Sequence, residues 1–266
     1  MPIRIAIHGA AGRMGQRLVA LGSADGDLRI AAAIDAPNNP RLGQDAGLLA
    51  GVGELGVPLT GNLTAPVDVV IDFSSPAGAV AITETCRARG QALVLATTGL
   101  TADQQARVRT AGENIPLLWA PSMSLAVNLA MKLSAVAAAA LKEHPSGADV
   151  EIIERHHRYK EDSPSGTALK FGQIIAGIMG QAEDRHGREG RIGARPHGEI
   201  GYHAVRVGDN PGEHTIVFAL LGETLEITVR ATNRDCYAHG ALAAAKFLAG
   251  KPAGLYTMND VLQIGG

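Results

Sequence analysis

Residues 154–168, ERHHRYKEDSPSGTA, hold the densest group of chemically versatile side chains in the sequence. Two imidazoles, two guanidiniums and one amine fall within positions 155–160. An imidazole can give or take a proton near neutral pH, and a lysine can donate a proton or hold a carboxylate. The segment is therefore a candidate site for acid–base chemistry on an anionic substrate.

A helix is predicted to begin directly after this basic run. Ser165, Gly166 and Thr167 would then present hydroxyls and unpaired backbone N–H groups at a helix N-terminus, which suits a carboxylate or a phosphate. The alternative is a charged strand end in which Ser165 only caps the helix. The order of residues does not match a phosphate-binding GxxxxGK[ST] loop.

Metal binding is a weaker interpretation of the two histidines. Neighbouring residues of a strand point to opposite faces, so His156 and His157 would not converge on one ion. The segment has no HExxH pattern and no carboxylate at a spacing that would complete a ligand set. We therefore expect no metal.

A glycine-rich turn, GAAGRMG at residues 9–15, follows the first predicted strand. The backbone N–H groups of such a turn can approach a diphosphate closely where the next helix begins. Asp35 lies 20 residues beyond Gly15, where an acid can bind the ribose hydroxyls of an adenosine. Together these features predict a dinucleotide site, although the turn alone could serve only tight packing.

The residues around the predicted site favour one cofactor. Ala36 follows the acid at a position where a basic side chain would hold a 2′-phosphate, so we predict NADH as the preferred cofactor. NADPH is possible because Arg41 could supply the charge.

Residues 97–99 and 121–124 follow the fourth and fifth predicted strands. They would therefore lie at the edge where open α/β sheets bind ligands. The alternative is that both segments are ordinary turns that cap helices.

Short β-branched runs alternate with helical stretches through the first half of the chain. The predicted strands are 3–7, 30–34, 67–71, 92–96 and 115–119, and the predicted helices are 13–22, 76–89 and 101–113. Continuous apolar strands separated by helices indicate a parallel sheet covered on both faces. The expected fold class is therefore α/β, with a Rossmann-type doubly wound sheet.

The pattern changes after an alanine-rich helix at about 124–141. Strands are predicted at 150–154, 201–207, 214–220 and 224–231, the last two joined at 222–223, and a helix at 166–179. These elements predict a second, α+β domain on a mostly antiparallel or mixed sheet. Residues 181–199 lack apolar periodicity and are predicted to be a long surface loop, either a solvated connection or a mobile lid.

A final helix is predicted at 235–248 and should pack back onto the first domain. The expected domains are thus 1–127 with 234–266, which binds a dinucleotide, and 128–233, which binds substrate and mediates oligomerisation.

Composition excludes several classes of protein. The 24 Lys and Arg residues against 26 Asp and Glu give a net charge of −2, and aromatics are only 3%, so a nucleic-acid partner is not expected. Cys86 and Cys236 lie too far apart for a zinc ribbon or a disulfide framework. The apolar tract 125–141 is short for a membrane span and contains polar residues, so we expect a cytoplasmic protein without a membrane partner.

Three motifs, HGAAGRMG at 8–15, ATTG at 96–99 and above all the segment 154–168, resemble the 4-hydroxy-tetrahydrodipicolinate reductase (dihydrodipicolinate reductase) family. The HHxxKxDxPSGTA pattern is far more specific than the glycine turn. The likeness spans nearly the whole chain, including GEHT at 212–215. It implies a nicotinamide-dependent reduction of a small dicarboxylate that yields tetrahydrodipicolinate in the diaminopimelate route to lysine, by a homotetramer joined through the second-domain sheets.

The resemblance also implies residue roles. His156 would be the acid or base and Lys160 the proton donor. The substrate would be held by His157, Ser165, Gly166 and Thr167. The cofactor would be bound by Gly9, Ala10, Ala11, Gly12, Arg13, Met14, Asp35, Ala96, Thr97, Thr98, Ala120, Pro121, Ser122 and Met123.

Two other functions remain open from the sequence. A non-catalytic NADH sensor would use the glycine turn but would not need His156, His157 and Lys160 beside a helix start. A nicotinamide-dependent reductase of another small dicarboxylate would need them, and competition by a planar pyridine dicarboxylate would distinguish it.

Overall fold

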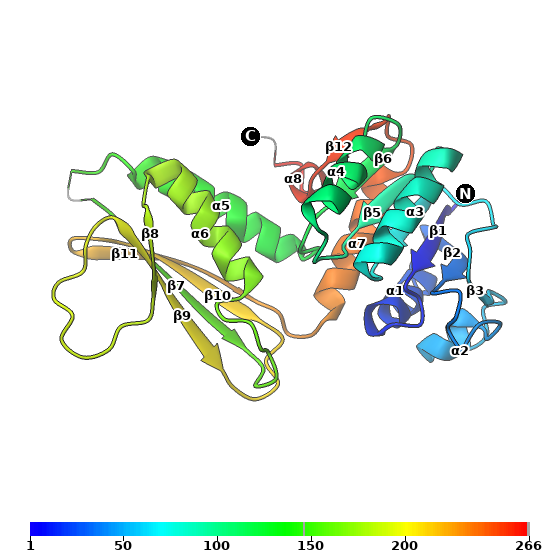
Figure 1. Ribbon diagram of the computed structural model, residues 1–266, viewed down its shortest axis with the longest axis horizontal. Coiled ribbons are helices and arrows are strands. Elements are labelled where there is room, and N and C mark those ends of the chain that lie inside the picture. The colour runs from blue at the N-terminus through cyan, green and yellow to red at the C-terminus, as the bar shows by residue number, and fades with distance from the viewer. Residues whose placement is uncertain (146, 265–266) are drawn as a thin grey trace. The chain divides into compact units, whose positions relative to one another are not determined.

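The computed structural model describes residues 1–145 and 147–264 and divides into two compact units, each with its own sheet (Figure 1). Unit 1 consists of Met1–Leu125 and Asp235–Gly266, and unit 2 consists of Ala126–Arg234. Unit 1 therefore contains both ends of the chain, and unit 2 is inserted within it.

Unit 1 is built on a seven-stranded sheet with the order β12-β6-β5-β4-β1-β2-β3, in which every pairing is parallel. Its strands are β1 (Ile3–His8), β2 (Leu28–Ile34), β3 (Leu59–Thr60), β4 (Val69–Asp72), β5 (Ala92–Leu95), β6 (Pro116–Trp119) and β12 (Gly254–Tyr256). Its helices are α1 (Arg13–Ser23), α2 (Ala46–Ala50), α3 (Pro76–Arg89), α4 (Ala102–Ala111), α7 (Asp235–Leu248) and α8 (Met258–Val261). The predicted α/β class is confirmed.

Two apolar layers hold this sheet between its helices. All four residues of β4 are buried, and they alternate between the layers: Val69 and Ile71 pack with α1 and α7, whereas Val70 packs with α3 and α4. A strand covered on both faces needs apolar side chains at successive positions, which is why β4 reads as a continuous apolar run. The expected return of the last helix to the first domain is confirmed by the packing of α7 on this sheet.

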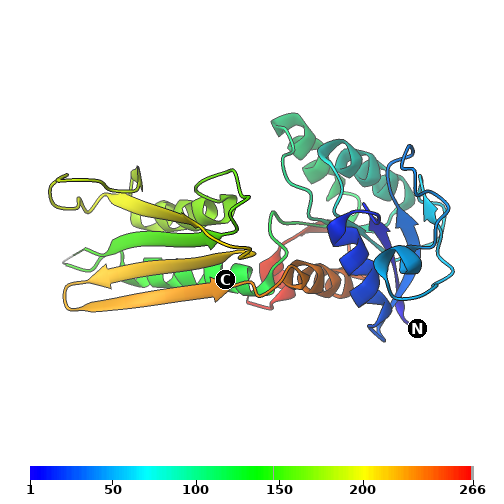
Figure 2. The ribbon, with the colours of Figure 1, turned by 90° about the horizontal axis from the view of Figure 1, so that it is seen from below.

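Unit 2 has a mixed five-stranded sheet with the order β11-β10-β7-β9-β8, covered on one face by two helices (Figure 2). Its strands are β7 (Asp149–His156), β8 (Glu183–His186), β9 (Glu199–Arg206), β10 (Glu213–Leu220) and β11 (Glu223–Arg230), and its helices are α5 (Leu125–Leu141) and α6 (Gly166–Met179). Ile152, Phe171 and Phe218 are fully or almost fully buried between sheet and helices.

The sheet is mixed because of how its strands are connected. The chain leaves β7 through α6 and enters β8, and residues 187–198 then lead to β9. Both connections restore the strand direction, so β9 pairs parallel with β8 and with β7. The connection after β9 reverses the chain, so β10 pairs antiparallel with β7, and a hairpin then joins β10 to the antiparallel β11. Its turn is Leu221–Gly222, one residue earlier than predicted, with Gly222 at φ 93°.

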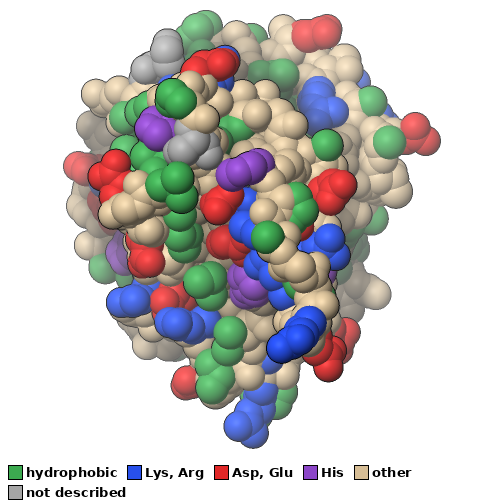
Figure 3. All heavy atoms as spheres, turned by 90° about the vertical axis from the view of Figure 1, so that its left-hand side faces the viewer, with side chains coloured by type: hydrophobic (Ala, Val, Ile, Leu, Met, Phe, Trp, Pro, Cys, Tyr) green, Lys and Arg blue, Asp and Glu red, His purple; other side chains and the backbone are tan. Residues whose placement is uncertain are grey.

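The prediction of a loop throughout 181–199 is wrong in part. Glu183–His186 form β8, which the sequence pattern could not reveal because all four side chains are exposed. The rest is tied to β7 by arginines: Arg188 and Arg195 both bind Glu151, at 2.7 and 2.8 Å. Figure 3 shows basic, acidic and histidine side chains interspersed on this end of unit 2.

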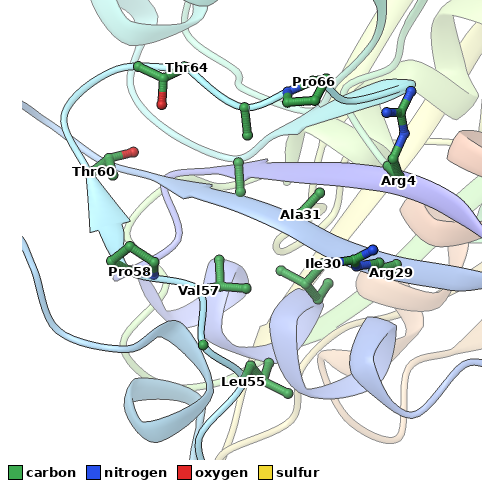
Figure 4. A pocket seen from close by; sticks show the side chains of 13 residues that line it. Arg4, Arg29, Ile30, Ala31, Leu55, Val57, Pro58, Thr60, Thr64 and Pro66 are labelled. Carbon is green, nitrogen blue, oxygen red and sulfur yellow. The ribbon is translucent and has the colours of Figure 1, made fainter.

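A hollow of about 460 Å³ lies along β2, between residues 55–58 and 64–66 (Figure 4). Arg4 and Arg29 are neighbours in register at one side of it, and Asp68 pairs with Arg4 at 2.6 Å. None of the predicted site residues lines this hollow.

A close contact between α7 and the segment before α5 gives a test of the packing. A Cβ on Gly240 would lie 1.7 Å from the carbonyl oxygen of Met123. We expect Gly240→Ala to lower the free energy of unfolding by about 2–3 kcal/mol, because backbone must move on both sides. The measurement is urea unfolding followed by circular dichroism.

Gly177→Ala is the matched control. Gly177 lies in α6, where a Cβ would meet nothing within 4 Å. This change should raise the stability by about 0.5–1 kcal/mol through helix propensity. Equal stability of the two variants would contradict the described packing.

Candidate active site

The glycine turn joins β1 to α1 and comes very close to the chain after β4. Gly9 has φ +79°, and a Cβ there would be 2.4 Å from the carbonyl oxygen of Phe73. A Cβ on Gly15 would be 2.1 Å from the carbonyl oxygen of Gly9. Only glycine fits at both positions, so the turn forms a cradle of bare backbone where α1 begins.

A cavity of about 570 Å³ opens beside this turn and is lined by Gly9, Gly12, Asp35 and Arg41, among others. Asp35 accepts hydrogen bonds of 2.9 Å from the backbone N–H of Ala11 and from the Asn39 side chain. Burial alone would raise the pKa of Asp35, but these hydrogen bonds lower it. A charged acceptor beside a glycine cradle fits the ribose and diphosphate of a dinucleotide.

The other predicted cofactor residues differ in what they offer to the cavity. The Thr97 hydroxyl is already used: it donates to Asp72 at 2.5 Å and accepts from the backbone N–H of Ser74 at 3.0 Å. Met14 and Ala96 are half-buried, whereas Ala10, Ala120 and Met123 are buried in the core of unit 1. Arg13, Thr98 and Pro121 are exposed, and Ser122 is half-buried.

In unit 2, His156 ends β7 and is held by a carboxylate on the same strand. Its Nδ1 lies 2.5 Å from Oε2 of Glu154. Because a carboxylate only accepts, Nδ1 donates and Nε2 is left for chemistry. A Cβ at position 212 would be 3.0 Å from Nε2, so Gly212 leaves that nitrogen room.

Glu154 is almost completely buried and accepts four hydrogen bonds. Besides His156, Arg206 of β9 donates to both of its oxygens at 2.8 Å, and the backbone N–H of Ser165 donates at 3.1 Å. Burial alone would raise the pKa of Glu154, but the bonds from His156 and Arg206 hold it at about 2. The carboxylate therefore stays charged and fixes both His156 and the start of α6.

Ser165 caps α6, as the alternative interpretation of the sequence expected, and it is also held by a second histidine. Its hydroxyl accepts from the backbone N–H of Ala168 at 3.1 Å and lies 3.0 Å from Nε2 of His214. Burial and the neighbouring His156 lower the pKa of His214 to about 4, so His214 is neutral where it shares this hydrogen bond with the Ser165 hydroxyl. The backbone N–H groups of Gly166 and Thr167 have no acceptor within residues 1–145 and 147–264.

Lys160 lies in the same electrostatic environment. Its Nζ is 2.7 and 2.9 Å from the carboxylate oxygens of Asp162, and its charge contributes to the lowered pKa of His214. His157 is half-buried, and its Nδ1 has no hydrogen-bond partner in the described part of the chain. The Arg155 side chain lies on the opposite face of β7 from His156 and pairs with Glu213 at 2.9 Å, so Arg155 is not part of this cluster.

Unit 2 thus brings His156, Lys160 and the start of α6 into one region, around three residues to which the sequence analysis gave no role. These are Glu154, Arg206 and His214. In the sheet register Arg206 lies beside His156, and His214 lies beside Glu154. Glu154, Arg206 and His214 each lie within a predicted strand, but the sequence does not predict which of those strands pair.

Comparison with known proteins identifies the family. Residues 3–123 match the family described as dihydrodipicolinate reductase, N-terminus, and residues 126–262 match dihydrodipicolinate reductase, C-terminus. The chain belongs to the dihydrodipicolinate reductase family. The resemblance seen in the sequence motifs is therefore confirmed.

Curated relatives of this reductase family are similar over their full length. The chain is 54% identical to the 4-hydroxy-tetrahydrodipicolinate reductase of Rhodopirellula baltica, with 98% of this chain and 96% of the relative covered. It is 47% identical to the enzyme of the same name from Alkalilimnicola ehrlichii, with 98% and 99% covered.

Solved structures agree with this assignment. The dipicolinate-bound dihydrodipicolinate reductase from Paenisporosarcina sp. TG-14 superposes with a TM-score of 0.78 at 28% identity, covering 97% of this chain and 98% of that one. The amine dehydrogenase of Mycobacterium smegmatis, at 13% identity and a TM-score of 0.67, shares the fold alone.

Among residues 1–145 and 147–264, no group of three or more His, Cys, Asp or Glu side chains could hold a metal ion. No helix of that part is both long and apolar enough to cross a membrane.

The role of Glu154 can be tested by an isosteric change. Glu154→Gln removes the charge that orients His156, so we expect kcat of the reductase reaction to fall by about 10- to 100-fold. Glu84→Gln is the control, because Glu84 of α3 also binds two arginines but lies in unit 1. Steady-state kinetics of both variants checks this, and equal losses would contradict a specific role for Glu154.

Proposed function

We propose that the protein reduces the 4-hydroxy-tetrahydrodipicolinate substrate to tetrahydrodipicolinate with a reduced pyridine nucleotide, in the diaminopimelate route to lysine. The observation that carries the proposal is the Glu154-bound His156 beside the open N–H groups at the start of α6. A group for proton transfer and a site for a carboxylate lie together there, in a chain whose curated relatives carry the name of this reductase. A sensor of NADH would need neither.

The start of α6 is proposed to hold a substrate carboxylate. The backbone N–H groups of Gly166 and Thr167 point out of the helix, and the helix dipole favours negative charge there. Ser165 keeps this turn in place through its cap and its bond to His214. His157 is the further proposed contact, because its Nδ1 still lacks a partner among the described residues.

His156 and Lys160 are proposed to handle the proton that accompanies reduction. The bound pyridine nucleotide supplies the hydride. Glu154 holds the His156 ring through Nδ1, so Nε2 is the nitrogen that can pass a proton to the substrate and regain it afterwards. Lys160 is the second donor, and its Nζ is held by the exposed Asp162 until substrate carboxylates compete for it.

The proposed cofactor site is the cavity beside the glycine turn, with NADH preferred and NADPH possible. Gly9, Gly12, Asp35 and Arg41 line it. The charged Asp35 suits two free ribose hydroxyls and would repel a 2′-phosphate, whereas Arg41 would attract one. The remaining proposed contacts are Ala10, Ala11, Arg13, Met14, Ala96, Thr97, Thr98, Ala120, Pro121, Ser122 and Met123.

We further propose that the two domains have different roles. Residues 1–127 with 234–266 would bind the dinucleotide, and 128–233 would bind substrate and assemble a cytoplasmic homotetramer. The open face of the unit 2 sheet supports this assembly, since α5 and α6 cover only its other face. Analytical ultracentrifugation would test the oligomeric state.

The activity is tested by following the near-ultraviolet absorbance of NADH while the preceding synthase makes the substrate from pyruvate and aspartate semialdehyde. We expect substrate-dependent oxidation, and a loss of about 10²- to 10⁴-fold in turnover for His156→Ala and for Lys160→Ala. Lys170→Ala, an exposed change on α6, is the control. A protein that binds NADH but oxidises it with no rate above background would be a sensor or act on another substrate.

Cofactor preference is tested by comparing KM for NADH and NADPH. We expect the lower KM for NADH. Arg41→Ala should raise KM for NADPH by about 3- to 5-fold and leave NADH unchanged, because an exposed ion pair contributes up to about 1 kcal/mol. Arg29→Ala, an exposed arginine away from this cavity, is the control. A lower KM for NADPH in the unchanged protein would refute the preference.

A further inference from the structure

His8 ends β1, directly before the glycine turn, and was given no role by the sequence motifs. Its side chain is only 11% exposed, and its Nδ1 lies 2.6 Å from Oδ1 of Asp72. His8 and Asp72 are partners in the parallel register of β1 and β4, so the strand pairing itself brings imidazole and carboxylate together.

Asp72 is completely buried, and its hydrogen bonds determine which nitrogen of the His8 ring can bind another partner. Ser74 donates its hydroxyl to Oδ1 at 2.6 Å, and Thr97 donates its hydroxyl to Oδ2 at 2.5 Å. The carboxylate can only accept, so Nδ1 of His8 donates to it. Nε2 is therefore the ring nitrogen that remains for another partner.

The His8 ring borders the cavity proposed to hold the dinucleotide. A Cβ on Gly78, the third residue of α3, would be 3.2 Å from Cε1 of His8, so a glycine there keeps the edge of the ring uncovered. The ring also lies near enough to Asp35 to contribute to the lowered pKa of that carboxyl. His8 is thus placed between the ribose-binding acid and the buried Asp72.

We propose that His8 is a cofactor-binding residue whose Nε2 hydrogen-bonds to the ribose–diphosphate part of the bound pyridine dinucleotide. Asp72, Ser74 and Thr97 are positioning residues: they fix the ring and leave Nε2 facing the cavity. The imidazole also separates the buried Asp72 carboxylate from an anionic ligand, which that charge would otherwise repel. This inference rests on the dinucleotide site proposed above.

The test is the dissociation constant of NADH and of NADPH for the full chain, measured by nucleotide fluorescence and by calorimetry without substrate. His8→Asn keeps a short N–H donor toward Asp72 but has no group in place of Nε2. His8→Ala removes both. We expect both variants to bind each dinucleotide about 10-fold more weakly than the unchanged protein. Binding by His8→Asn equal to that of the unchanged protein would overturn the proposal.

A second measurement does not depend on the folding of any variant. In the unchanged protein labelled with ¹⁵N-histidine, the His8 Nε2 resonance should shift when NADH is added and should not shift with the dicarboxylate alone. A His8 resonance that does not respond to NADH would also overturn the proposal. If the unchanged protein binds neither dinucleotide, the proposed cofactor site itself fails, which is a different result.

Discussion

The buried carboxylate of Glu154 is the interaction on which the arrangement of unit 2 depends. A charge removed from water at this depth is tolerated only when hydrogen bonds replace its hydration, and Glu154 has four. Those bonds come from β7 itself, from β9 and from the first turn of α6. The same carboxylate therefore fixes the histidine, the strand register and the helix start.

The parallel pairing of β7 and β9 makes this possible. The crossover through α6 to β8 and the connection from β8 to β9 both return the chain in the same direction, so Arg206 lies at the end of β9 beside His156 at the end of β7. An antiparallel β9 would place its last residue at the far end of β7. The helix that makes the crossover also supplies the N–H groups proposed to hold the substrate, so one connection provides both parts of the site.

Unit 1 contains a comparable arrangement at the carboxyl edge of its sheet, where Asp72 of β4 holds His8 of β1. In both units a carboxylate inside the protein orients an imidazole by accepting a hydrogen bond from Nδ1.

The sequence predicted the segments around these carboxylate–imidazole pairs better than the pairs themselves. Glycine spacing, Asp35 and the HHxxK run are local patterns, and the cradle and the candidate site form where they indicate. The partners Arg206, His214 and Asp72 lie on other strands, and the register that joins them is set by tertiary packing.

The insertion of unit 2 within unit 1 has a consequence for synthesis on the ribosome. Ala238, Ala241 and Leu242 of α7 fill one face of the parallel sheet, yet they emerge only after all of residues 126–234. Until then that face lacks its cover over apolar side chains such as Ile71 of β4 and Val94 of β5. The amino-terminal segment cannot complete its folding co-translationally, although an N-terminal domain ordinarily folds first. The nascent chain must therefore keep a half-covered sheet from aggregating while the inserted unit is made.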